Sequence, residues 1–217
     1  GQRLACLDRQ LVRLEGTLAG LRRLVSERPE LLVDRLDEVG DYLPDPERCE
    51  AAPLLERRHL LPSDPALLAT IDALESERAL VEGRFDGDKD YEAAHTAGEA
   101  LLARARASEF DPLIAEVLLL VAQIDYERAR EDTAGAERRL SEAAWTAQRV
   151  GHDEVLVDAA ATLVRVLAVT GRLEPARLWA ELGRATLARL DADSPAEAEL
   201  LLALAELEGA EGDFEGA

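Results

Sequence analysis

Apolar residues recur along most of the chain at the three- and four-residue spacing of an α-helix that buries one face. In the first 28 residues the spacing is regular enough to form a heptad seam. The seam consists of Leu4, Leu7, Leu11, Leu14, Leu18, Leu21 and Val25. The pattern predicts one long amphipathic helix that ends at Pro29. Packing on neighbouring helices is the favoured interpretation, and self-association through the seam is the alternative.

Two shorter helices are expected between this seam and the middle of the chain. The spacing predicts one over residues 30–39 and another over residues 47–60, with a proline-containing loop over 42–47. We therefore expect residues 1–62 to form an N-terminal helical segment that caps or abuts an array formed by residues 63–217.

From residue 63 onward a short pattern repeats at nearly constant intervals. In each copy an alanine follows three residues after a mostly bulky side chain, and successive alanines are 42, 40 and 41 residues apart. The four alanines are Ala94, Ala136, Ala176 and Ala217. A period in this range is typical of a stacked array, in which each unit buries its apolar stripe only against the next.

Each period contains two predicted helices. The first helix should start where Asp or Ser can cap free backbone N–H groups, in most cases with Pro directly behind it. The expected starts are Asp64-Pro65, Asp111-Pro112, Asp153 and Ser194-Pro195. Helices should stop where a glycine can adopt the left-handed conformation at little cost. The expected stops are Gly83, Gly151, Gly171 and Gly212.

The apolar stripes of successive helices differ in side-chain size. One large stripe consists of Ile114, Val117, Leu118, Val121 and Ile124, and its expected partner of Ala136, Leu140, Ala143 and Ala147. A second stripe of Leu163, Val166 and Leu167 should face Leu173, Ala176, Ala180, Gly183 and Leu187. Small side chains let two helix axes approach closely, and a larger one would overpack the crossing by about 1–3 kcal/mol.

The turn segments resemble those of the tetratricopeptide repeat (TPR). The closest matches are Gly171-Arg172-Leu173-Glu174-Pro175-Ala176 and Gly212-Asp213-Phe214-Glu215-Gly216-Ala217. The resemblance covers residues 64–217. It implies an all-α, right-handed α-solenoid of about three and a half helix pairs, with a period near 41 in place of the usual 34. The first two repeats depart from the pattern, because Lys89 and Glu131 stand where the turn glycine is expected.

The chain as a whole, including its opening Ala5-Cys6-Leu7-Asp8-Arg9, is similar to the region that follows the catalytic domain in large bacterial serine/threonine protein kinases. The sequence itself carries none of the kinase signature motifs. The resemblance therefore implies a non-catalytic region that binds a protein partner and regulates or scaffolds the kinase. Bacterial signal-transduction ATPases that regulate transcription have sensor arrays with similar repeats. They would imply binding of a small ligand or an inhibitory protein instead.

Charge is distributed unevenly along the chain. The formal net charge is −20, and residues 63–217 carry 33 acidic against 15 basic side chains. Residues 1–28 are the exception, with six Arg against three acidic side chains. A charge of this sign and size argues against nucleic-acid binding. It is compatible with a folded chain, since 47% of the residues are hydrophobic.

The same composition bears on location. No apolar run is long enough to span a membrane, and the N-terminus lacks the apolar core of a signal peptide. The two cysteines, Cys6 and Cys49, are too few for a disulfide scaffold. We expect free thiols in the cytoplasm, with a regulatory disulfide between these two cysteines as the alternative.

The expected partner-binding surface is the concave face that TPR arrays line with first helices. The alignment places five charged residues toward it. They are Asp125, Asp158, Arg165, Glu199 and Glu206. A groove of this kind would favour a basic peptide or helix, through steering and charge-assisted hydrogen bonds. No cofactor is expected.

Other candidate chemistry is weaker. Asp86, Asp88 and Asp90 resemble the start of a calcium loop, but Tyr91 and Ala97 occupy the positions that need Gly and a bidentate Glu. We interpret this segment as an acidic turn between helices.

Metal and catalytic signatures are equally sparse. His59, His95 and His152 are scattered and show no metal-ligand spacing. An α-helical hydrolase would need paired buried carboxylates, and no such pairing is evident. Trp145 and Trp179 are expected in the core between repeats.

Overall fold

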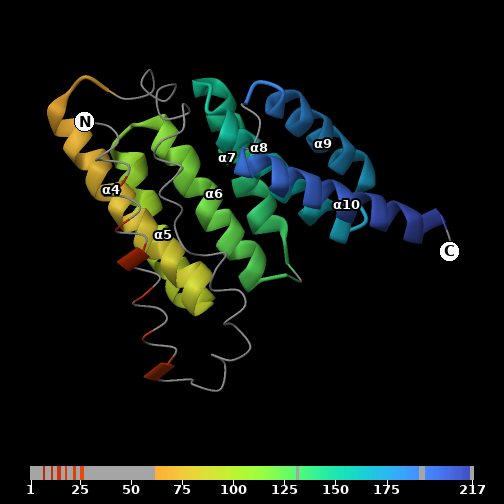
Figure 1. Cartoon of the computed structure of the whole chain (residues 1–217), viewed down its shortest axis with the longest axis horizontal. Helices are drawn as coiled ribbons and strands as arrows, with labels where there is room; N and C mark the ends of the chain where they lie inside the picture. The colour runs from red at the N-terminus through yellow and green to blue at the C-terminus, as the bar shows by residue number, and fades with distance from the viewer. Residues whose placement is uncertain are drawn as a thin grey trace. The chain divides into compact units, whose positions relative to one another are not determined.

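The computed structural model describes residues 62–130, 132–190 and 194–215, together with single helical residues between positions 7 and 26. Every regular element longer than one residue in this part of the chain is helical (Figure 1). The α-helices are α4 (Pro65–Gly83), α5 (Tyr91–Ala107), α6 (Asp111–Arg128), α7 (Ala134–Val150), α8 (Asp153–Val169), α9 (Leu173–Leu187) and α10 (Pro195–Glu215). A π-helix, η4 (Arg84–Asp88), follows α4. The helices predicted over 30–39 and 47–60 lie outside the described residues.

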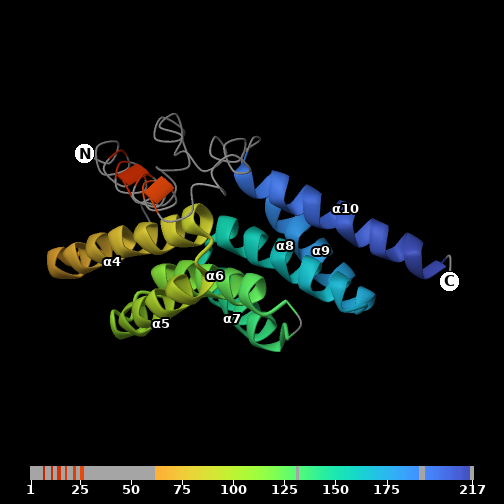
Figure 2. The ribbon, with the colours of Figure 1, turned by 90° about the horizontal axis from the view of Figure 1, so that it is seen from below.

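The chain forms two compact units, Gly1–Ser108 and Glu109–Ala217. In the first, α4 packs against α5, and η4 connects them. In the second, α6 packs against α7 and α8 against α9, as the complementary stripes predict. Helix α8 also contacts α6 and α7, and α10 lies against both α8 and α9 (Figure 2). Consecutive helices are therefore packed in pairs, an arrangement consistent with an α-solenoid.

Several predicted boundaries are confirmed. Helix α4 begins at Pro65, and the Asp64 carboxylate accepts a hydrogen bond from the Ala66 N–H at 2.9 Å. Gly151 and Gly171 both have a φ of 71°, the left-handed conformation that ends a helix with little strain at glycine.

Other helix starts differ in detail from the expectation. Helix α6 begins at Asp111 itself, with Phe110 at the N-cap, and α8 begins at Asp153 after His152. Both aspartates thus occupy the first helical position, where their negative charge still interacts favourably with the positive end of the helix dipole. At α10 the backbone carbonyl of Ser194 accepts the hydrogen bond from Glu197, and the Ser194 hydroxyl has no partner.

One predicted stop is wrong, and another lacks the expected conformation. Helix α4 ends at Gly83 as predicted, but Gly83 has a φ of −59° and the chain continues from it into the π-helix η4. The left-handed residue is Lys89, directly before Asp90, whose carboxylate caps α5. Helix α10 runs through Gly212 to Glu215, so the fourth predicted turn is helical and Ala217 lies outside the described residues. Glycine permits a left-handed stop but does not impose one.

The small residues lie where the helices pack most closely. Ala94, Ala136 and Ala176 are at most 1% exposed. A Cβ atom built on Gly183 of α9 would come within 2.9 Å of Leu200 Cδ1 on α10, closer than side chains normally approach. The absence of a side chain at Gly183 therefore sets how closely α10 can pack on α9.

The tryptophans are less buried than predicted. The rings of Trp145 on α7 and Trp179 on α9 lie 5.4 Å apart between centroids, so they do connect successive pairs. Trp145, however, is 56% exposed. The core between these helices is filled by alanines, and the wide indole rings are left at its rim.

Candidate functional site

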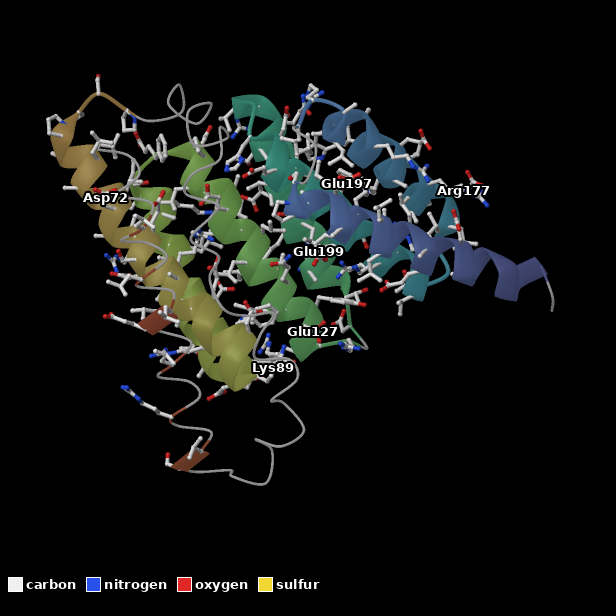
Figure 3. All side chains as sticks on the ribbon, viewed as in Figure 1. Asp72, Lys89, Glu127, Arg177, Glu197 and Glu199 are labelled. Carbon is white, nitrogen blue, oxygen red and sulfur yellow. The ribbon has the colours of Figure 1, made fainter. Side chains whose placement is uncertain are left out.

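Three of the five predicted partner-binding residues come together on α8 and α10. The Arg165 guanidinium of α8 is bonded to the Glu199 carboxylate of α10 (Glu199 is labelled in Figure 3). The Arg165 Nε atom lies 4.0 Å from a carboxylate oxygen of Glu206, which is about two helical turns further along α10 than Glu199. These three residues form a charged cluster that we call the first-helix cluster, since α8 and α10 are the first helices of their predicted pairs.

Tyr126 of α6 lies within electrostatic reach of this cluster and was missed by the sequence reasoning. Burial raises the pKa of its hydroxyl, and the charges of Arg165 and Glu206 also act on it. The Arg130 guanidinium lies 5.8 Å from the centre of its ring. Tyrosine is rare in this chain, so an aromatic residue directly after Asp125 was the available signal.

The structure does not bring Asp125 and Asp158 into the cluster in the same way. Asp125 is 9% exposed and its carboxylate accepts a hydrogen bond from Arg139 of α7 at 2.6 Å, which ties the two helices of a pair together. Asp158 is half-buried on α8, and its backbone carbonyl accepts a bond from the Thr162 hydroxyl.

The carboxylates of the first-helix cluster are the accessible part. The side chains of Glu199 and Glu206 are 56% and 45% exposed, whereas that of Arg165 is 22% exposed. Ion pairs with this much solvent access contribute about 0–1 kcal/mol. An incoming cation could therefore replace Arg165 as a partner of either glutamate at small cost.

A different set of ion pairs holds the helix pairs together. Arg149 at the end of α7 bonds to Asp111 at the start of α6, at 3.0 Å. Arg189 just after α9 bonds in the same way to Asp153 at the start of α8, at 2.6 Å, and this hydrogen bond raises the pKa of Arg189. These pairs recur at equivalent places and explain why acidic residues begin the first helices.

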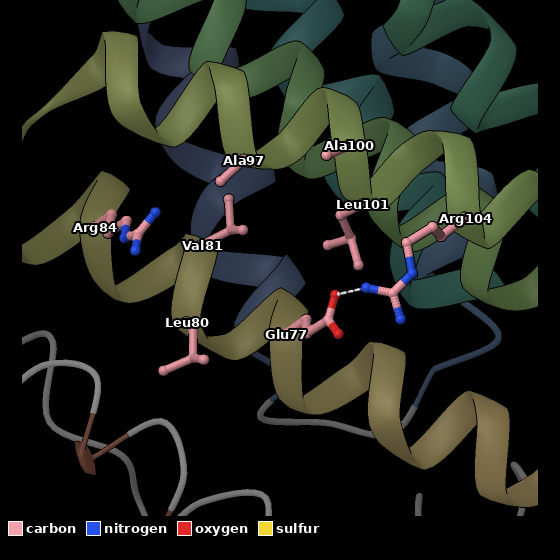
Figure 4. A pocket seen from close by; sticks show the side chains of 8 residues that line it. All are labelled: Glu77, Leu80, Val81, Arg84, Ala97, Ala100, Leu101 and Arg104. Carbon is pink, nitrogen blue, oxygen red and sulfur yellow. Dashed lines mark hydrogen bonds and ion pairs between the residues drawn. The ribbon is translucent and has the colours of Figure 1, made fainter.

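A shallow groove of about 260 Å³ lies between α4 and α5 in the first unit (Figure 4). Its lining includes Leu80 and Val81 of α4 and Ala100 of α5. An ion pair between Glu77 and Arg104 crosses from one helix to the other, and this hydrogen bond raises the pKa of Arg104. The volume is slightly below the roughly 300–1,000 Å³ usual for small-molecule sites.

The remaining candidate residues have local roles. His152 is buried and its Nε2 atom lies 2.8 Å from the Glu116 carboxylate of α6, while His95 lies 3.4 Å from Glu99. Asp90 caps α5, as an acidic turn would. Among the residues that the structure describes, no group of three or more potential ligands could hold a metal ion. His59, Cys6 and Cys49 lie outside the described residues.

None of the helices in the described ranges combines the length and apolar character needed to cross a membrane.

Comparison of the chain with protein-family models, with curated proteins and with solved structures returned no match.

Proposed function

We propose that this chain is a non-catalytic protein-interaction module, a right-handed TPR-like solenoid that binds a basic peptide or helix along its first helices. The observation that carries the proposal is the first-helix cluster. Arg165, Glu199 and Glu206 converge from two first helices, and the charges of two of them act on Tyr126 of a third. Exposed carboxylates around an aromatic residue suit a partner that carries Lys or Arg.

The repeat interpretation has support in the helix positions. Helices α6, α8 and α10 begin at Asp111, Asp153 and Pro195, so each of these helices begins 42 residues after the one before it. The ion pairs of Arg149 and Arg189, which lie at equivalent places, support the interpretation of α6–α7 and α8–α9 as two copies of one unit.

The context of the module comes from the sequence resemblance. We propose that it is the regulatory, partner-binding arm of a bacterial serine/threonine protein kinase. The coding sequence upstream of residue 1 tests this directly. An open reading frame that continues into a kinase domain supports it, and one that encodes a nucleotide-binding ATPase domain instead overturns it.

The second candidate is the sensor array of a signal-transduction ATPase, which would bind a small ligand or an inhibitory protein. The groove between α4 and α5 favours it, because an apolar wall faces the Glu77–Arg104 ion pair there. Measuring the melting temperature of the protein with each compound of a small-molecule library tests this candidate. A compound that binds in the groove should raise the melting temperature of the wild type but not that of Ala100→Trp, in which the indole ring fills the groove.

The experiment for partner binding compares matched charge reversals. The variant Glu199→Lys/Glu206→Lys changes the first-helix cluster, and Glu174→Lys/Glu181→Lys changes exposed carboxylates of α9. Immobilised chains are exposed to a cell extract and eluted with salt. A protein retained by the wild type and the α9 variant but lost by the cluster variant supports the proposal. Equal retention by all three overturns it.

A further inference from the structure

Helix α10 has two apolar faces. One consists of Ala196, Leu200, Ala203, Leu204 and Leu207, which are all at most 9% exposed. The other lies on the opposite side of the helix and is exposed. It consists of Ala198, Leu201, Leu202, Ala205 and Gly209, and we call it the outer stripe. Leu201 and Leu202 are 57% and 53% exposed, so more than half of each of these neighbouring leucines is in contact with solvent.

The outer stripe is open and closely approachable. A Cβ atom built on Gly209 would meet nothing within 4 Å. The small side chains of Ala198, Ala205 and Gly209 lie along its middle, with a leucine to either side, so it can accept the large apolar side chains of a second helix. Contiguous exposed apolar surface of this kind marks an interaction site.

Glutamates border the stripe on both edges. At 100° per residue, Glu199 and Glu206 fall on one edge, and Glu197 and Glu208 on the other. The helix contains no Lys or Arg. A second α10 would therefore meet like charges on both edges, whereas an apolar seam in a segment of net positive charge would be attracted to them.

The chain itself contains another exposed apolar seam, in a segment of opposite net charge. Leu11, Leu18 and Val25 of the heptad seam are 54%, 39% and 50% exposed, at a spacing of seven residues. They are helical, as are Leu7 and Leu14, whereas Leu4 and Leu21 lie outside the described residues. Residues 1–28 carry six Arg against three acidic side chains, in contrast to the acidic remainder of the chain.

We propose that the outer stripe of α10 is a self-association surface that receives the leucine seam of a second copy. The contact is heterologous, because the two surfaces that meet are different. An open assembly of any size keeps one unoccupied seam at one end and one unoccupied stripe at the other, so it grows with concentration unless it closes into a ring. The stripe shares its Glu199 and Glu206 edge with the first-helix cluster, but the inference rests on the exposed leucines and needs no basic partner, so it and the proposed function can fail separately.

Two variants of the full chain, each lacking one of the two surfaces, test the proposal. Leu201→Glu/Leu202→Glu removes the stripe and Leu11→Glu/Leu18→Glu removes the seam. By light scattering, the average mass of the wild type should rise with concentration. Each variant alone should be monomeric at concentrations at which the wild type associates. Its dissociation constant should be at least about tenfold higher, because the substitution buries a charge where the wild type has an apolar contact.

Mixing the two variants gives the decisive readout. The stripe variant still has its seam and the seam variant still has its stripe, so an equimolar mixture should form a one-to-one heterodimer that grows no further. A stripe variant that still associates alone would instead indicate seam-to-seam pairing and overturn the proposal. A seam variant that still associates alone would indicate stripe-to-stripe pairing, with the same consequence. A wild type that stays monomeric at all concentrations also overturns it.

Matched controls separate the stripe from general effects of charge. Leu178→Glu changes an α9 residue that is 73% exposed and should leave the concentration dependence unchanged. Glu208→Lys keeps every leucine and should weaken association, and the addition of Arg22→Glu should restore it. Restoration by the second charge would be absent if Glu208→Lys merely disturbed folding, which circular dichroism also checks.

Discussion

Helices α8 and α10 are both rich in leucine and alanine, yet they lie in different surroundings. Twelve of the seventeen residues of α8 are buried, because α6, α7, α9 and α10 all pack on it. Among the described helices, α10 packs mainly on α8 and α9, and one of its apolar faces is exposed. Apolar composition therefore indicates that a helix can be buried, while the number of neighbours decides how much of it is.

The largest expected effect is in the middle of α8. Leu163 is fully buried, and Leu163→Ala removes its contacts and leaves a cavity. We expect a loss of about 2–5 kcal/mol in the free energy of unfolding. Urea denaturation followed by circular dichroism measures it. A loss below about 1 kcal/mol would show that α8 is not the centre of its unit.

A smaller loss is expected where α9 packs against α8. Ala176 is fully buried, so Ala176→Leu should overpack the crossing and cost about 1–3 kcal/mol. Ala185→Leu adds the same side chain at an exposed position of α9 and serves as the control. A melting temperature that is unchanged or raised in Ala176→Leu, relative to the wild type, would contradict the close approach of these helices.

The ion pair that connects α8 and α10 should contribute little. Because the Glu199 side chain is more than half exposed, Glu199→Ala should change the free energy of unfolding by about 0–1 kcal/mol. Thermal denaturation of the two proteins side by side gives the value. Cooperative loss of helicity in the variant would mean that Glu199 supports the fold rather than a binding surface.

The smallest effect is expected on the outer stripe, and it tests the comparison most directly. Leu202→Ala in dilute solution should change stability by no more than about 0.5 kcal/mol. Leu200→Ala, two residues earlier on the buried face, should cost about 2–5 kcal/mol. Equal losses for the two variants would show that the outer stripe is covered within a single chain.

The sequence predicted much of this architecture for local reasons. Helical periodicity identified the helices of both units, and the caps at Asp64 and Gly151 followed from backbone chemistry that needs no partner. The stop at Gly212 was wrong, and Gly83 ends α4 without the left-handed conformation expected of it, because a glycine turns the chain only if the following residues turn away. The predictions that concern residues 30–60 lie outside the described part of the chain.

The candidate surface was predicted less completely. Alignment of the repeats on their turn motif identified Arg165, Glu199 and Glu206 as residues of first helices, but only packing brought them together and placed Tyr126 within reach of their charges. The carboxylate of Asp125 faces Arg139 because α7 lies on that side of α6, which no spacing in the sequence reveals.

The sequence by itself determined that this protein is helical, paired and acidic, because helix formation and charge depend on residues close together in the chain. The tertiary structure decided which apolar faces are covered. A leucine on α8 and a leucine on the outer stripe of α10 have the same side chain, and burial depends on whether another helix lies within van der Waals reach.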